Sequence, residues 1–79
     1  MNYFKEFRLF LEDGTVVEHK YIRKMTARQL ARDVRKQAKL EKDPVGFELI
    51  PWDDDYSNII FGFIESLDGP RWFAEVEDE

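Results

Sequence analysis

Residues 26–40, TARQLARDVRKQAKL, carry the clearest periodic pattern in the chain. The apolar side chains that recur there at helical spacing are Ala27, Leu30, Ala31, Val34 and Ala38. Thr26 is a residue type favoured as a helix N-cap, and Pro44 disfavours helical geometry in the residue before it. We therefore predict a helix that begins after Thr26 and ends near Leu40. Its apolar face consists mostly of small residues, which let a helix approach a sheet closely.

The residues before this helix alternate in the way that strands do. In residues 3–11 the apolar side chains fall on one face with a period of two. An Asp-Gly pair within residues 12–15 favours a tight turn, because glycine accepts a positive φ. Residues 16–22 then return, so the two segments predict a β-hairpin. The side chains expected on the shared faces are Phe7, Leu9 and Leu11 in the first strand and Val17, His19 and Tyr21 in the second.

Three further strands are predicted after the helix, at residues 46–52, 59–66 and 71–77. Residues 67–70, Leu-Asp-Gly-Pro, are predicted to form the turn between the last two strands. The element order is therefore β-β-α-β-β-β. It predicts a single small α+β domain, residues 1–79, with one helix packed on a mostly antiparallel sheet.

The opening hairpin followed by a helix also resembles the start of a β-grasp (ubiquitin-like) domain. The resemblance covers the first half of the chain and rests on element order. It implies a late strand that lies parallel to the first strand. The short turn at residues 67–70 favours an antiparallel meander at the end instead.

Charge is distributed unevenly along the chain. Residues 20–42 hold nine basic side chains against two acidic ones, a net charge of +7, whereas the chain as a whole has a net charge of −5. The remaining residues hold three basic and fifteen acidic side chains, a net charge of −12. Such a polarised protein presents two electrostatic surfaces, each of which is able to recognise a partner.

The first candidate binding surface is a basic ridge, defined as Arg28, Arg32, Arg35, Lys36 and Lys39. Four of these residues step by four, three and four, and Lys36 lies beside them. Like charges at this spacing repel by roughly 0.2–0.5 kcal/mol per pair, so solubility alone does not explain the pattern. One interpretation is a surface for RNA, DNA or an acidic protein. The other is a solvated face whose charge is balanced by acidic segments of the same molecule.

The second candidate is an acidic loop, defined as Trp52, Asp53, Asp54, Asp55 and Tyr56. An acidic surface with aromatic side chains suits a partner's basic groove, as a nucleic-acid mimic does, and complementary charge speeds such association. The alternative is an ordinary solubilising loop. The aspartate run lacks the Asp-x-Asp-x-Asp-Gly calcium-loop spacing, so we expect no metal there.

The sequence contains no pattern typical of a catalytic site. There is no cysteine, which excludes disulfides and thiolate metal ligands. His19 is the only histidine, has no nucleophile at a suitable spacing, and is expected to be structural or superficial. We therefore expect no enzymatic activity, no catalytic residues, no cofactor, no metal and no small-molecule substrate.

Neither a targeting nor a membrane-spanning segment is predicted. Residues 1–10 lack a basic lead followed by an apolar run, and the longest apolar stretch, residues 59–64, is too short to cross a bilayer. The absence of cysteine fits a reducing compartment, so we expect a cytoplasmic protein with no membrane partner.

The chain is small, has a net negative charge, is rich in aromatic residues and lacks catalytic motifs. Together these features favour a protein–protein interaction module. We expect an inhibitor or adaptor that occupies a surface of a larger macromolecular complex. This profile is similar to that of phage proteins that block host defence, anti-CRISPR proteins among them. The alternative hypothesis is RNA or DNA binding through the basic ridge. If neither charged surface binds, the aromatic residues of the exposed sheet face are the remaining candidates.

Overall fold

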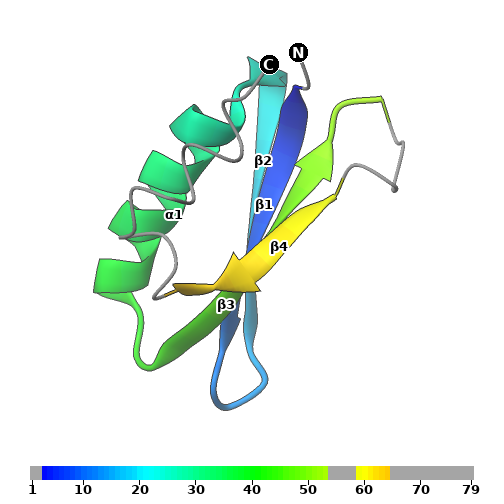
Figure 1. The fold of residues 1–79 in the computed structure, drawn as a ribbon. Coiled ribbons are helices and arrows are strands. Elements are labelled where there is room, and N and C mark those ends of the chain that lie inside the picture. Colours follow the sequence, from blue (N-terminus) through cyan, green and yellow to red (C-terminus); the bar gives the residue numbers. More distant parts are fainter. Residues whose placement is uncertain (1–2, 54–58, 65–79) are drawn as a thin grey trace.

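One helix packs on a four-stranded antiparallel sheet in the described part of the computed structural model, which comprises residues 3–53 and 59–64 (Figure 1). The predicted α+β class is confirmed. The elements are β1 (Phe4–Leu11), β2 (Val16–Met25), α1 (Ala27–Leu40), β3 (Pro44–Pro51) and β4 (Ile60–Phe63). The strand order is β2-β1-β3-β4, and each neighbouring pair is antiparallel.

β2 and β3 flank β1 and run in the same direction, with α1 as the crossover between them. β1 therefore has antiparallel neighbours on both sides, whereas a β-grasp domain places a parallel strand beside its first strand. The described strands do not have the β-grasp topology. The reason is the short α1–β3 connection: the Glu12 backbone N–H donates to the Asp43 carbonyl at 2.9 Å, which holds the start of β3 beside the end of β1.

The start of α1 is fixed by a reciprocal pair of hydrogen bonds. The Thr26 hydroxyl accepts a hydrogen bond from the Gln29 backbone N–H at 3.2 Å, and the Gln29 side chain accepts one from the Thr26 N–H at 3.0 Å. This capping box satisfies two donors that the helix itself leaves without partners. The predicted N-cap and the predicted end of the helix near Leu40 are both confirmed.

The core lies between α1 and the sheet face that it covers. Its buried side chains are Phe4, Phe7, Leu9, Met25, Ala27, Leu30, Ala31, Val34, Phe47 and Leu49. Ala38, which was predicted to be part of the buried face, is only partly buried and packs against this cluster. Most of the predicted helix face is thus confirmed as core.

A β-bulge at Lys5 brings Phe4 into the core together with Phe7. The two phenylalanines are three positions apart, so a regular strand would place them on opposite faces. The pairing of β1 with β3 shifts by one residue between Phe4 and Glu6, which leaves Lys5 as the extra residue. Both phenylalanines are consequently almost fully buried beneath α1.

Several element boundaries differ from the predicted ones. β2 extends to Met25, three residues beyond the predicted end, and β3 begins at Pro44 rather than at residue 46. β4 falls within the predicted strand 59–66. The last predicted strand, residues 71–77, lies outside the described residues.

Leu30→Ala should lower the free energy of unfolding by about 2–5 kcal/mol, because it opens a cavity at a fully buried position of α1. Leu40→Ala is the matched control, since Leu40 lies on the same helix but is 79% exposed, and its effect should be within about 0.5 kcal/mol. Urea unfolding of both variants measures the difference. Equal midpoints for the two variants would show that this face of α1 is not core.

Candidate binding surfaces

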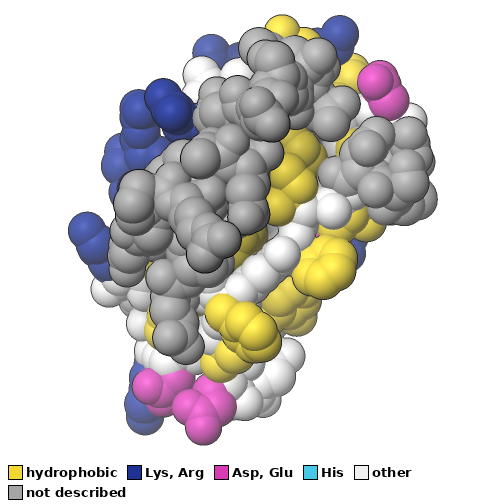
Figure 2. Space-filling model, viewed as in Figure 1, with side chains coloured by type: hydrophobic (Ala, Val, Ile, Leu, Met, Phe, Trp, Pro, Cys, Tyr) yellow, Lys and Arg dark blue, Asp and Glu magenta, His cyan; other side chains and the backbone are white. Residues whose placement is uncertain are grey.

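The basic ridge lies along the outer side of α1, where Figure 2 shows Lys and Arg side chains gathered. Arg28, Arg32, Lys36 and Lys39 are exposed, and Arg35 is half-buried. Among the described residues, no carboxylate lies within 4 Å of Arg32, Lys36 or Lys39. All five residues lie on α1, as predicted, and their role as a binding surface stays a prediction.

The rest of the basic segment lies on β2. Lys20, Arg23 and Lys24 are exposed on this strand, which is an outer strand of the described sheet. The Lys24 ammonium lies 5.6 Å from the centre of the Tyr3 ring, a cation–π contact. The local charge of +7 is therefore divided between a helix and a strand rather than concentrated on one face.

Only part of the predicted acidic loop can be placed. Trp52 is half-buried, and its backbone N–H donates to the Tyr3 carbonyl at 2.9 Å. Asp53 is exposed. Asp54, Asp55 and Tyr56 lie outside the described residues, so the convergence of the loop stays a prediction.

The sheet face opposite α1, here called the distal face, carries a row of charged residues. Arg8 donates to Glu6 at 3.1 Å and to Glu48 at 3.3 Å. The hydrogen bond to Glu6 raises the pKa of the Arg8 guanidinium above its ordinary value, and the charges of the surrounding carboxylates act in the same direction. Glu18 pairs across from Arg8 on β2 and supplies a third carboxylate. Three anions thus surround one cation.

An apolar row lies next to this charged row on the distal face. Phe10 pairs with Val16 and with Gly46, and Gly46 pairs with Phe63, so the four residues cross all four described strands. Phe10, Gly46 and Phe63 of this row line an open groove of about 380 Å³, together with Val45 of β3 and Phe61 of β4. The groove residues, here called the aromatic groove, are Phe10, Val45, Gly46, Phe61 and Phe63.

Phe61 and Phe63 are 75% and 69% exposed, and Figure 2 shows hydrophobic side chains over β4. Clustered exposed aromatic side chains are unusual on a monomer surface and mark interaction sites. Sequence reasoning named this surface only as a last candidate and did not name these residues. The available signal was that strand 59–66 is apolar on both faces, which one covering helix cannot bury.

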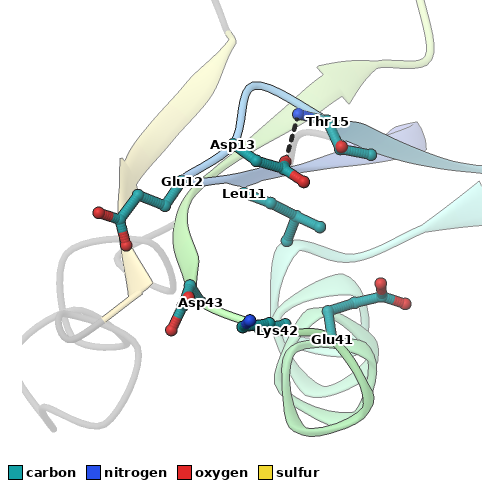
Figure 3. A pocket seen from close by; sticks show the side chains of 7 residues that line it. All are labelled: Leu11, Glu12, Asp13, Thr15, Glu41, Lys42 and Asp43. Atoms are coloured by element: carbon teal, nitrogen blue, oxygen red, sulfur yellow. Dashed lines mark hydrogen bonds between the residues drawn. The ribbon is translucent and has the colours of Figure 1, made fainter.

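Carboxylates gather at the end of the sheet where the β1–β2 turn meets the α1–β3 connection (Figure 2). The pocket there is lined by Leu11, Glu12, Asp13, Thr15, Glu41, Lys42 and Asp43. Figure 3 shows that the Glu12, Glu41 and Asp43 carboxylates point in different directions. Within the described residues no group of three or more acidic or histidine side chains is arranged to hold a metal ion.

Asp13 in this pocket has a structural role in the turn. Its carboxylate accepts a hydrogen bond from the Thr15 backbone N–H at 2.8 Å (Figure 3). Hydrogen bonds from the side chain and backbone of Thr15 lower the pKa of Asp13. Gly14 follows with a φ of 91°, as the Asp-Gly turn predicts.

His19 is the middle member of an aromatic stack on the α1 side of the sheet. Its ring centre lies 5.4 Å from that of Phe7 and 4.7 Å from that of Tyr21. The Tyr21 hydroxyl in turn donates to Asp33 of α1 at 2.6 Å. The exposed His19 therefore packs as a structural residue, which confirms the prediction for it. Burial, together with the hydrogen bond to Asp33 and its charge, raises the pKa of Tyr21 well above the ordinary value.

No helix in the described ranges 3–53 and 59–64 combines the length and apolar composition needed to cross a bilayer. No protein-family model, curated protein or solved structure matches the chain.

Tyr21→Phe should destabilise the protein by about 0.5–1.5 kcal/mol near neutral pH, because Asp33 loses its hydrogen-bond donor. Since the pKa of Tyr21 is raised in the folded state, its contribution is complete below the ordinary tyrosine pKa of about 10 and is lost as the pH rises through the folded value. The difference in unfolding free energy between wild type and variant should therefore be constant up to about pH 9 and shrink as the pH rises above about 10.

Denaturant unfolding across this range tests the prediction. Tyr3→Phe is the matched control, since Tyr3 is an exposed tyrosine outside the buried core. A Tyr21→Phe difference that varies with pH no more than the Tyr3→Phe difference would contradict the role assigned to the Tyr21–Asp33 hydrogen bond.

Proposed function

We propose that the protein is a non-enzymatic protein–protein interaction module, an inhibitor or adaptor that occupies a surface of a larger macromolecular complex. The observation that carries this proposal is the exposure of Phe61 and Phe63, 75% and 69%, beside each other on the distal face. Aromatic residues are enriched at the centres of protein interfaces, where a few of them supply most of the binding energy.

The shape of the distal face favours a macromolecular partner over a small molecule. Ligand sites for small molecules enclose most of their ligand, whereas the aromatic groove is open and lies across several strands. A partner protein that covers this face would bury both phenylalanines at once. Small size and acidic balance favour an inhibitor of the phage anti-defence type, working in the cytoplasm.

Site-specific photo-cross-linking tests this proposal. Phe61 is replaced by p-benzoylphenylalanine, which keeps the aromatic ring, and the chain is irradiated in cells of the organism that encodes it. We expect a discrete covalent adduct with one protein, identified by mass spectrometry. The same amino acid at Ile22, which is fully exposed on β2, is the matched control and should give no such adduct. Equal adducts at both positions, or none at Phe61, would contradict the proposal.

A second candidate function is nucleic-acid binding through the basic ridge. It is favoured by one observation: Arg32, Lys36 and Lys39 are exposed cations with no carboxylate of the described residues within 4 Å. Phosphate groups satisfy such cations and release condensed counterions when they bind.

Arg32→Glu combined with Lys36→Glu should abolish this binding if the basic ridge contacts phosphates. Fluorescence anisotropy of labelled duplex DNA and single-stranded RNA, measured from about 50 to 300 mM salt, gives the affinity and its salt dependence. Three phosphate contacts would give a slope of about −3 in a plot of log K against log salt for duplex DNA. Lys20→Glu with Arg23→Glu makes the same charge change on β2 and should retain binding. No binding by the wild type, or equal loss in both variants, would exclude the basic ridge as a specific site.

A further inference from the structure

The aromatic groove has a gap in its centre that is suited to an inserted side chain. Gly46 lies between Phe10 and Phe63 in the row of paired residues, and it contributes no side chain. The floor of the groove is therefore backbone. A Cβ atom added at Gly46 would come within 3.1 Å of the Gly62 carbonyl oxygen and 4.0 Å of a Phe10 ring carbon. A side chain at position 46 would therefore crowd β4, and with glycine there the groove of about 380 Å³ keeps its space between Phe10 and Phe63.

Carboxylates flank the apolar row on both sides. On one side lies the charged row, in which Glu18, Glu48 and the buried Glu6 surround Arg8. Lys20 pairs with Glu6, at the end of that cluster away from the groove. Arg8 already donates to two of the three carboxylates, so the cluster still presents net negative charge.

On the other side of the apolar row, β1 continues into the β1–β2 turn, which carries Glu12 and Asp13. Both residues are exposed. The adjoining pocket holds four carboxylates and one ammonium group, the latter from Lys42. An apolar groove between two acidic clusters favours an occupant that combines an apolar side chain with flanking positive charge, because complementary potentials steer association and select partners.

On the basis of the function proposed above, we propose that the aromatic groove binds a basic segment of a partner protein. One apolar side chain of that segment enters above Gly46, between Phe10 and Phe63. Lys or Arg side chains on either side of it approach Glu18 and the β1–β2 turn. The proposal assigns the partner a basic surface with a protruding apolar residue.

A second copy of this chain fits the groove poorly. Each copy carries a net charge of −5, and a symmetric contact would bring the same acidic clusters face to face. Like charges placed opposite one another oppose association. An acidic partner is disfavoured at this face for the same reason, although it suits the basic ridge of α1.

Affinity selection from a displayed library of random 12-residue peptides on the immobilised full chain tests the inference. We expect the enriched peptides to be net positive and to contain a large apolar residue. Their binding should fall on the order of 30-fold in Phe63→Ser, the loss typical of removing an interface hot spot. Ile22→Ser is the matched control, because it removes an exposed apolar side chain from β2, and it should bind as the wild type does.

The charge requirement is tested separately with Glu18→Lys. This exposed residue flanks the groove, so the association rate of the enriched peptides should fall, and the fall should be smaller at high salt. Asp53→Lys makes the same charge change near the opposite end of β3 and should leave the rate unchanged. Circular dichroism and thermal unfolding confirm that each variant is folded before its binding is compared.

Four outcomes would overturn the inference: no enrichment, enrichment of acidic or uncharged peptides, binding retained in folded Phe63→Ser, or a loss in Asp53→Lys equal to that in Glu18→Lys. Different experimental outcomes contradict the inference and the proposed function. If Phe61 cross-links one partner protein but the selected peptides are not basic, the interaction role stands and the basic occupant does not. If Phe61 yields no specific adduct, the interaction role at this face is itself contradicted.

Discussion

The packing of α1 on one face of the sheet is the constraint on which the rest of the structure depends. Leu30, Ala31 and Val34 lie fully buried against the sheet, and the small side chain of Ala31 allows close approach. The bulge at Lys5 supplies this contact with two phenylalanines instead of one. The helix of the described residues covers only one face of the sheet. The side chains of the distal face must therefore be accommodated without a second helix packed on them. That requirement connects the core to the candidate binding surface.

The distal face meets this requirement with an ion network over part of its area. Arg8 donates to Glu6 and Glu48, and no buried polar side-chain atom of the described residues is left without a hydrogen-bond partner. The Arg8 side chain is 39% exposed, and ion pairs in contact with water contribute little to stability because solvent and salt screen them. Phe61 and Phe63 of the adjoining aromatic row do not stabilise the distal face in this way, because both side chains remain largely in water. On the function proposed above, these exposed side chains serve binding.

The helix, the hairpin and the fold class could be predicted because each depends on local periodicity. The Thr26 cap, the apolar spacing through Val34 and the Asp-Gly turn are properties of neighbouring residues. The aromatic groove could not be predicted in the same way, because it depends on register: Phe10 meets Gly46, and Gly46 meets Phe63, across strands far apart in sequence. The bulge at Lys5 escaped prediction for the same reason, and it moves Phe4 to the opposite face. The basic ridge was predicted because one helix sets its geometry.

The two candidate surfaces differ in sign, which limits how one partner can use both. The outer side of α1 presents exposed cations, whereas the aromatic residues of the distal face lie near carboxylates. A uniformly basic partner is attracted to the distal face and repelled by the basic ridge, so the charge distribution orients its approach before any contact forms. A uniformly acidic partner, including a nucleic acid, is oriented in the opposite way. The aromatic groove then acts after encounter, because apolar burial adds affinity only for the partner whose approach brings Phe61 and Phe63 into the interface. In the proposed interaction, charge selects which side of the molecule is presented, and the aromatic side chains determine how long the complex persists.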